Sequence, residues 1–272
     1  MPDLLEALLH KAKNGMILIA DELDIAQTFC KPLIEIEIIA LNNGICPARY
    51  SRNIGTISQA QQADLLSKRC VVLGCGGLGG YIIESLARLG IGKITAVDYD
   101  VFDESNMNRQ WLSSKDTLGK SKAEVAKQRV TDINPAIEFV AIKEQLNQTN
   151  AETFLAYADV AIDALDNFSS RCNLLHACGN LSVPLISGSV AGWYGTVYIC
   201  YDAYSKMEAL YASYKNERGI ETDLGNPAFM PAIIASIQST YACKVLLNMD
   251  VEKTNKFLSV DALTMSFDEF IL

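Results

Sequence analysis

A glycine-rich turn between a buried strand and a helix is the feature that most restricts the fold of this chain. Residues 69–73 (RCVVL) predict a short buried strand, GCGGLG follows at 74–79, and residues 81–89 have the apolar spacing of a helix. A second strand is expected at 93–97, and it leads directly into Asp98. This order is typical of a nucleotide-binding β-α-β unit with an acidic residue at the tip of its second strand.

The glycines of this turn fit the pattern G-x-G-x-x-G. Gly74 permits the tight turn, Gly76 lets a phosphate approach the backbone, and Gly79 lets helix and strand pack closely. Free N–H groups at the helix N-terminus favour an anion, and Asp98 stands where an acid accepts hydrogen bonds from ribose hydroxyls. These features predict a nucleotide that contains ribose. The same features are consistent with a nicotinamide oxidoreductase, and a glycine turn that binds no ligand is the remaining alternative.

The rest of the chain alternates between strand and helix patterns. Strands are expected at 138–142, 159–164 and 184–187, and helices at 121–132, 151–155 and 169–181. This alternation predicts an α/β fold with a Rossmann-like, doubly wound, mainly parallel sheet. Later strands at 193–201, 256–260 and 264–270, with a helix at 231–247, predict an antiparallel C-terminal extension.

The first 46 residues have a different character. Three helical patterns lie in this segment, and it ends at Cys46-Pro47. We therefore expect a small helical N-terminal appendage over 1–46 and one larger domain over 47–272. The appendage carries no chemical motif, so packing or an interface is expected of it rather than catalysis, and its role is left open.

Composition excludes several classes of function. The net charge is −9 and the isoelectric point about 4.8, which argues against nucleic-acid or anionic-membrane binding. No apolar run is long enough to cross a bilayer, and the start of the chain lacks the features of a secretory signal, so a cytoplasmic protein is expected. The eight cysteines include no C-x-x-C pair, and His10 and His176 have no ligand spacing, so no zinc site is expected.

Three polar segments contain side chains that could bind the phosphates of a nucleotide. Residues 103–111 (DESNMNRQW) contain Arg109, which could grip phosphate oxygens. In 118–122 (LGKSK) Lys122 lies near a helix start, where a lysine is unfavourable unless an anion attracts it. In 163–167 (DALDN) a carboxylate follows a buried strand, at the edge where Mg²⁺ and phosphates bind. Taken singly, a solvated loop or an ordinary surface lysine explains the first two equally well.

Taken together, these segments resemble the ThiF/MoeB/HesA family, bacterial relatives of ubiquitin-activating enzymes. The resemblance covers the chain from about Arg49 onward. It is carried by RYSR at 49–52, GCGGLG at 74–79, DYD at 98–100, SNMNRQ at 105–110, LGKSK at 118–122 and DN at 166–167, in this order.

The resemblance implies an ATP-dependent adenylyltransferase that uses Mg²⁺. The substrate would be the C-terminal glycine carboxylate of a small ubiquitin-like sulfur-carrier protein that ends in Gly-Gly, and it would become an acyl-adenylate with release of pyrophosphate. The implied nucleotide-binding set is Gly74, Gly76, Gly77, Gly79, Asp98, Asp100, Asn106, Arg109, Lys122, Asp166 and Asn167. Arg109, Lys122, Asp166 and Arg52 would act in catalysis, and Asp166 would bind the Mg²⁺. Arg52 would reach the ATP site of a neighbouring subunit, which implies a homodimer.

The residue types suit this chemistry, since a carboxylate is already a nucleophile at neutral pH and needs no histidine or serine to activate it. The chain departs from many family members because it lacks their two zinc-binding C-x-x-C pairs. The segment 202–227 matches a loop that in some relatives holds a sulfur-transferring cysteine, and here that loop has no cysteine. Cys200 and Cys243 flank it and are expected to be structural thiols, while Tyr204, Tyr211 and Tyr214 would contact the carrier tail or only pack locally.

Four functions stay open at this point. The first is carrier activation in thiamine, molybdenum- or tungsten-cofactor synthesis or another sulfur pathway. The second is a tRNA-modifying or small-molecule carboxylate-activating member of the same superfamily. The third is an NAD-dependent oxidoreductase, and the fourth is a scaffold that binds a carrier without turnover.

Overall fold

A computed structural model describes residues 3–202, 204–207, 221–249 and 253–271 of the chain. Its centre is an eight-stranded sheet with the strand order β10-β9-β8-β7-β6-β3-β4-β5. The strands are β3 (Arg69–Leu73), β4 (Lys93–Val97), β5 (Glu138–Ile142), β6 (Val160–Asp163), β7 (Leu185–Ala191), β8 (Tyr194–Cys200), β9 (Lys256–Asp261) and β10 (Ser266–Ile271). The five strands β7, β6, β3, β4 and β5 are parallel, and β8, β9 and β10 add to the β7 edge in antiparallel fashion.

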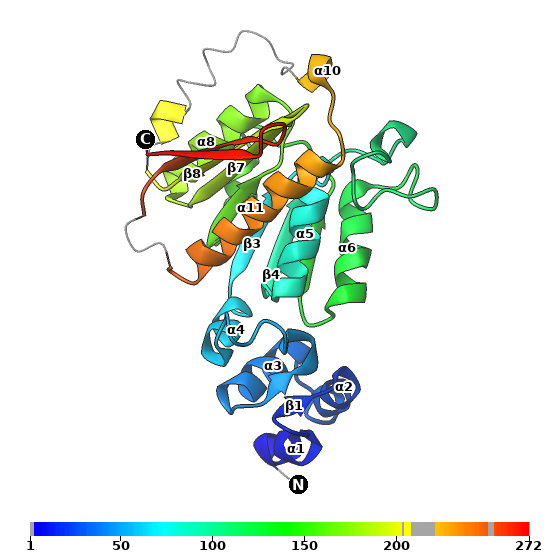
Figure 1. Cartoon of the computed structure of the whole chain (residues 1–272). Helices are drawn as coiled ribbons and strands as arrows, with labels where there is room; N and C mark the ends of the chain where they lie inside the picture. The colour runs from blue at the N-terminus through cyan, green and yellow to red at the C-terminus, as the bar shows by residue number, and fades with distance from the viewer. Residues whose placement is uncertain (1–2, 203, 208–220, 250–252, 272) are drawn as a thin grey trace.

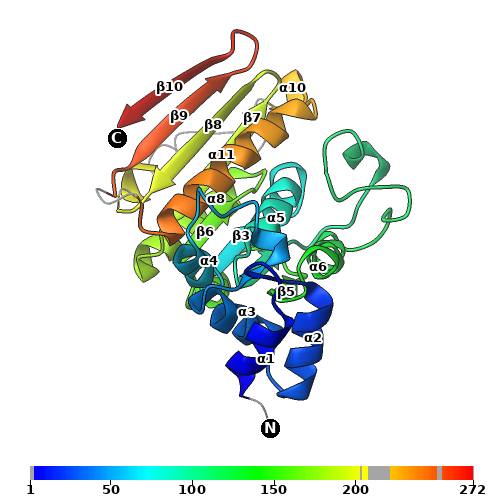
Figure 2. The ribbon, with the colours of Figure 1, turned by 60° about the horizontal axis from the view of Figure 1, so that its bottom comes forward.

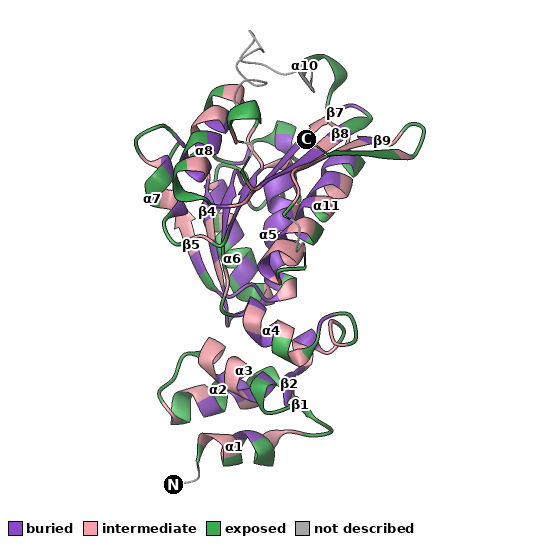
Figure 3. Cartoon of the chain, turned by 90° about the vertical axis from the view of Figure 1, so that its left-hand side faces the viewer, coloured by how far each residue is buried: buried purple, intermediate pink, exposed green. Residues whose placement is uncertain are grey.

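Helices cover both faces of the parallel part of the sheet (Figure 1, Figure 3). One face packs against α5 (Gly77–Leu89), α6 (Lys122–Ile133) and α11 (Phe229–Leu246), and the other against α7 (Ala151–Leu155) and α8 (Phe168–Leu181). Two separate apolar clusters result, one on each face of the sheet. The expected α/β fold, with a mainly parallel sheet and an antiparallel C-terminal extension, is confirmed.

Two boundaries differ from the sequence-based expectation for identifiable reasons. Helix α5 begins at Gly77 rather than near residue 81, because the glycines of the turn form its first helical turn and carry no apolar side chain to reveal it. Strand β7 continues to Ala191 rather than stopping at 187, because it pairs along its whole length with β8, up to the pair Ala191–Tyr194. Hairpin pairing thus lengthens a strand that its local sequence ends early.

The N-terminal segment packs below the sheet (Figure 2). It contains α1 (Leu4–Lys11), β1 (Met16–Ile17), α2 (Ile19–Thr28) and α3 (Leu33–Asn42), and β1 pairs with β2 (Cys46–Pro47). These helices bury a small apolar cluster of their own around Leu8, Ile25 and Ile36. A second cluster joins α3 to α4 (Gln59–Leu65) and to Tyr50.

The chain's helices are not membrane spans: within the described residues none is both long and apolar enough to cross a bilayer.

Candidate active site

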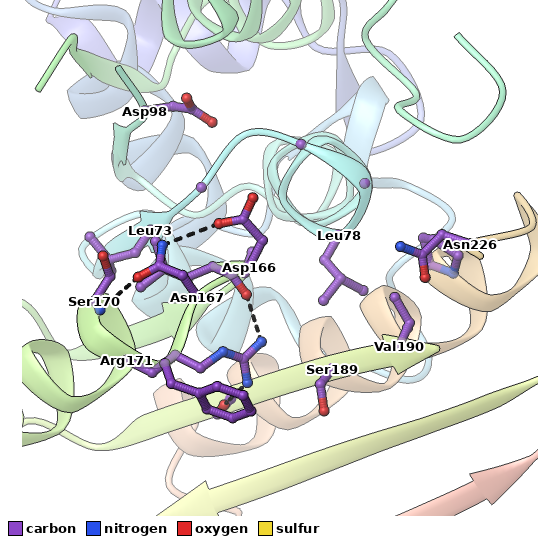
Figure 4. A pocket seen from close by; sticks show the side chains of 18 of the residues that line it. Leu73, Leu78, Asp98, Asp166, Asn167, Ser170, Arg171, Ser189, Val190 and Asn226 are labelled. Atoms are coloured by element: carbon purple, nitrogen blue, oxygen red, sulfur yellow. Dashed lines mark hydrogen bonds between the residues drawn. The ribbon is translucent and has the colours of Figure 1, made fainter. Parts of the chain in front are cut away.

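A large cavity of about 1280 Å³ opens at the carboxyl ends of the parallel strands. Its walls come from the glycine turn after β3, the ends of β4 and β6, the start of α8, and β7 and β8 (Figure 4). Ligands bind at this edge in open α/β sheets, because helix N-termini and loops converge there. The cavity is therefore the candidate active site.

The glycine turn is shaped by two close backbone contacts. Gly74 has φ +97°, and a Cβ there would lie 2.6 Å from the carbonyl oxygen of Ala164. A Cβ on Gly79 would lie 1.8 Å from the carbonyl oxygen of Gly74, so helix α5 approaches the turn as closely as a glycine allows. Gly74, Gly76 and Gly77 line the cavity, and Gly79 lies behind them. The N-terminus of the 13-residue helix α5 thus faces the cavity and favours an anion there.

Asp98 ties the end of β4 to this turn. One carboxylate oxygen accepts a hydrogen bond from the N–H of Cys75 at 2.7 Å, and the other accepts one from the N–H of Asp100 at 2.8 Å. Burial raises the pKa of Asp98, against these two hydrogen bonds and the charge of Lys122, which lower it. Asp98 lines the cavity and is half-buried, so its carboxylate can meet a ligand as well as the backbone.

Two cations from different segments line the same cavity. Lys122 is the first residue of α6; it is buried, and its Nζ lies 2.6 Å from Oδ2 of Asp100. This ion pair lowers the pKa of Asp100 although burial works the other way. Arg109 donates to the carbonyl oxygen of Ser105 at 3.0 Å and to Oδ1 of Asn108 at 2.8 Å. Across the described part of the chain, no carboxylate lies within ion-pair distance of Arg109.

A carboxylate, that of Asp166, lines the same cavity. Asp166 is exposed, and its Oδ1 accepts a hydrogen bond from Nδ2 of Asn167 at 3.2 Å. Asn167 is the N-cap of α8, where its Oδ1 accepts from the N–H of Ser170 at 2.8 Å. In Figure 4 both side chains lie between the glycine turn and Arg171. Among the residues that the structure describes, no lysine or arginine pairs with Asp166, so this carboxylate is available to a ligand.

Three predicted site residues do not line the cavity. Asn106 is buried, and its Oδ1 accepts from the N–H of Asp103 at 3.1 Å, so it holds the loop before Arg109. Gly79 lies inside the turn, as described above. Arg52 is exposed, just beyond the short helical turn Ala48–Tyr50, and outside this cavity. The other nine members of the predicted set line it: Gly74, Gly76, Gly77, Asp98, Asp100, Arg109, Lys122, Asp166 and Asn167.

A buried polar network that the sequence does not predict lies beneath Asp166. Asp163 is 1% exposed and accepts hydrogen bonds from Oγ of Ser187 at 2.6 Å and from the N–H of Leu165 at 2.9 Å. Arg171 is 7% exposed and lies 3.6 Å from Asp163. An arginine in the first turn of an ordinary helical pattern gives no local sign of burial. Its partners include Ser187 and Gly188 of β7, so no local sequence pattern predicts its burial.

The cavity also extends over the antiparallel strands, where Ser189, Thr196, Tyr198 and Phe257 line it. The described tyrosine of the following loop, Tyr204, packs locally: its hydroxyl donates to the carbonyl oxygen of Val183 at 2.8 Å. Tyr211 and Tyr214 lie outside the described residues.

The flanking thiols are covered by protein. Cys200 is fully buried, and Cys243 is half-buried with a pKa raised by that burial. In the described ranges no group of three or more His, Cys, Asp or Glu side chains is arranged to hold a metal ion. A cation at Asp166 would therefore need ligands from a bound molecule.

Comparisons with known proteins agree with this geometry. A model of the ThiF family matches residues 50–272. The chain is 32% identical to a SAMP-activating enzyme E1 of Haloferax volcanii over 225 residues, which are 81% of this chain and 83% of that protein. It is 31% identical to the molybdopterin-synthase adenylyltransferase of Escherichia coli over 82% of this chain and 92% of that protein.

Other similarities are shorter or more distant. A tRNA threonylcarbamoyladenosine dehydratase of Bacillus subtilis is 37% identical over 140 residues, 51% of this chain and 55% of that protein. Among solved structures, Escherichia coli MccB with ATP superimposes with a TM-score of 0.65 at 21% identity, over 92% of this chain and 79% of that one. This likeness supports the fold.

Proposed function

The chain belongs to the ThiF family and is an adenylyltransferase, and from that premise we propose that it uses ATP to adenylate the C-terminal carboxylate of a small ubiquitin-like sulfur-carrier protein. The observation that carries this proposal is the composition of one cavity. A glycine turn, a helix N-terminus, Arg109 and Lys122 offer positive charge to an anion, and Asp166 offers a carboxylate to a cation.

The triphosphate of ATP would lie over Gly76 and Gly77, within reach of Arg109 and Lys122. Lys122 would exchange its contact with Asp100 for a phosphate oxygen, a small movement for a flexible side chain. The ribose would lie at Asp98, whose carboxylate lines the cavity beside the turn. This arrangement leaves the α-phosphate between the cations and Asp166.

The chemistry then needs position and charge rather than a base. A carboxylate oxygen of the carrier bonds to the α-phosphorus, and the bond from that phosphorus to the bridging oxygen breaks. Pyrophosphate leaves with the electron pair, and no proton has to be removed. Arg109 and Lys122 stabilise the negative charge that spreads over the phosphates.

The described residues fit a magnesium ion if the bound phosphates supply its other ligands. Mg²⁺ favours one or two carboxylates together with phosphate oxygens, and Asp166 is an accessible carboxylate with no cation beside it in the described chain. Asp166 would hold the ion together with the phosphates, and Asn167 would steady that carboxylate through its 3.2 Å hydrogen bond. When bound, Mg²⁺ neutralises part of the phosphate charge.

A carrier protein is favoured over RNA as the substrate. The relatives named as activators of SAMP or as molybdopterin-synthase adenylyltransferases match more than 80% of this chain, whereas the tRNA dehydratase matches 51%. The net charge of −9 is also unfavourable for binding a polyanion. We further propose a homodimer in which Arg52, exposed and outside its own cavity, reaches the cavity of the second copy. We also propose a cytoplasmic location for this chain and its carrier.

Pyrophosphate exchange tests the proposal. The purified chain is incubated with ATP, Mg²⁺, labelled pyrophosphate and a carrier from the same organism that ends in Gly-Gly. Return of label into ATP, dependent on the carrier and on its terminal glycine, is expected. ATP binding without exchange for every such carrier would favour a scaffold, and exchange that depends on tRNA would favour the RNA-modifying alternative.

A further inference from the structure

The wall that carries Asp166 contains two acids with opposite environments. Asp166 is exposed to the cavity, whereas Asp163, three residues earlier, is 1% exposed and surrounded by hydrogen-bond donors. Beside it lies Arg171, 7% exposed. A buried arginine is costly unless the protein satisfies its N–H groups, so its partners indicate its role.

Both N–H bonds of the Arg171 Nη2 atom are used by the backbone. They donate to the carbonyl oxygens of Leu165 at 2.6 Å and Gly188 at 2.8 Å. Its Nη1 atom donates to Oγ of Ser187 at 3.4 Å and lies 3.6 Å from Asp163. Arg171 therefore joins the loop after β6 to strand β7. A dashed line in Figure 4 marks a hydrogen bond of Arg171 beside Asp166.

Leu165 is the residue directly before Asp166, and its backbone is held at both ends. Its N–H donates to Asp163 at 2.9 Å, and its carbonyl oxygen accepts from Arg171 at 2.6 Å. On the other side, Asn167 is held by its cap to Ser170. The backbone on both sides of Asp166 is thus fixed, while its own carboxylate has only the amide of Asn167 as a partner in the described chain.

We infer that Arg171 is a positioning residue, which, together with Asp163, holds the Leu165 peptide so that the carboxylate of Asp166 points at the metal and phosphates. This inference rests on the proposed role of Asp166. It gives the two acids of the DALDN segment different roles: the buried Asp163 stabilises the loop, and the exposed Asp166 binds the ligand. Arg171 also lines the cavity, but both N–H bonds of its Nη2 atom are directed to the two carbonyl groups, so its proposed role is exerted through the backbone.

The test measures how Mg²⁺ changes ATP affinity in the full chain, by calorimetry with ATP, first with Mg²⁺ and then with a chelator. The variants are Arg171→Met, Arg171→Lys, Asp166→Asn and the double variant Arg171→Met/Asp166→Asn. Lysine keeps the charge but, as a point donor, cannot span both carbonyl groups. Arg129→Met is the control, since Arg129 pairs with Glu84 on α5 and does not line the cavity.

Arg171→Met is expected to reduce the tightening by Mg²⁺ by about tenfold, the effect usual for a residue that orients a metal ligand. The Kd for ATP in chelator should stay within about twofold of the wild type. Asp166→Asn should behave in the same way, and the double variant should be no worse than Asp166→Asn, because both changes act on one carboxylate. Arg129→Met should retain the full effect of Mg²⁺.

An equal loss of ATP affinity with and without Mg²⁺ in Arg171→Met would overturn the inference, since it would mean direct contact with the nucleotide. Additive losses in the double variant would also overturn it. Should Arg171→Met not fold, Arg171→Lys decides: a wild-type response to Mg²⁺ contradicts the inference, and a reduced response supports it. Failure of the proposed function would appear differently, as a wild-type chain that does not bind ATP.

Discussion

Charged side chains have different environments in two regions: they are buried in ion pairs at the junction with the N-terminal helices, whereas in the cavity some of them are accessible and have no ionic partner among the described residues. At the junction, Glu22 of α2 and Glu37 of α3 are both fully buried, and Arg49 pairs with each of them. In the cavity, Asp166 is exposed, and Arg109 bonds only to a carbonyl oxygen and an amide among the described residues.

The junction continues into the main domain through further hydrogen bonds. The hydroxyl of Tyr50 donates to Glu37 at 3.0 Å, and the amide of Asn134 donates to the oxygen of Tyr50 at 2.7 Å and to the carbonyl oxygen of Ala87 at 3.1 Å. Charges satisfied in this way hold elements together. Charges left without an ionic partner at a concave surface, as at Arg109 and Asp166, indicate a ligand, and this contrast separates these two residues from the ion pairs of the junction.

Removing the arginine of the junction should have the largest effect. Arg49→Met leaves Glu22 and Glu37 buried without a counter-ion, which typically costs about 3–5 kcal/mol of the free energy of unfolding. Urea unfolding monitored by circular dichroism measures this loss. The Kd for ATP of the folded variant should be unchanged. Normal stability together with weakened ATP binding would reverse the assignment of the two regions.

The cavity should respond in the opposite manner. Arg109→Ala and Asp166→Ala should each lower the rate of pyrophosphate exchange by about 10²–10³-fold, since Arg109 is one of the two cations proposed to stabilise the phosphates and Asp166 is the proposed ligand of Mg²⁺. Their thermal midpoints should stay near that of the wild type, because neither residue has an ion-pair partner in the described structure. Exchange at the wild-type rate in either variant would show that this wall does not carry the reaction.

The glycine turn contains one glycine that is required for packing and another that faces the proposed ligand. Gly79→Ala places a Cβ against the carbonyl oxygen of Gly74 and should cost about 1–3 kcal/mol of stability. On Gly77 a Cβ meets only ordinary contacts, 3.7 Å from Pro231 and 3.9 Å from Arg109, but it faces the cavity. Gly77→Ala should therefore fold normally and weaken ATP binding by about tenfold, through loss of a hydrogen bond to a charged group. Thermal unfolding and calorimetry on the two variants compare them directly.

The smallest effect concerns Glu22 and pH. Burial raises the pKa of Glu22, although the charge and hydrogen bond of Arg49 lower it. A carboxyl whose pKa is raised in the folded state contributes stability below its unfolded pKa of about 4.3, and this contribution is lost as the pH rises through the folded pKa. Glu22→Gln should remove this loss, so its stability relative to the wild type should increase as the pH rises above about 4.3. If the stability of Glu22→Gln relative to the wild type instead falls as the pH rises, the effect of Arg49 on the pKa of Glu22 outweighs that of burial.

The parts of this account that local sequence predicts are those with local causes. The glycine turn and the alternating strands and helices have spacings that indicate their environment. The segments around Arg109, Lys122 and Asp166 are predicted by their joint resemblance to a family, and nine predicted residues line one cavity. Arg171 and Arg49 have no such signal. Each is buried by partners from elements far along the chain, Gly188 for one and Glu22 for the other, so only the assembled fold reveals them.

Labelled ATP shows which phosphate bond the enzyme cleaves, and this decides whether it adenylates a carrier. The chain, Mg²⁺ and a Gly-Gly-ended carrier are incubated with ATP labelled at the α-phosphate and, separately, at the γ-phosphate. Cleavage between the α- and β-phosphates predicts α-label on the carrier, removable by hydroxylamine, and γ-label in pyrophosphate. Release of the γ-label as orthophosphate, with ADP as the other product and no α-label on the carrier, would contradict the account.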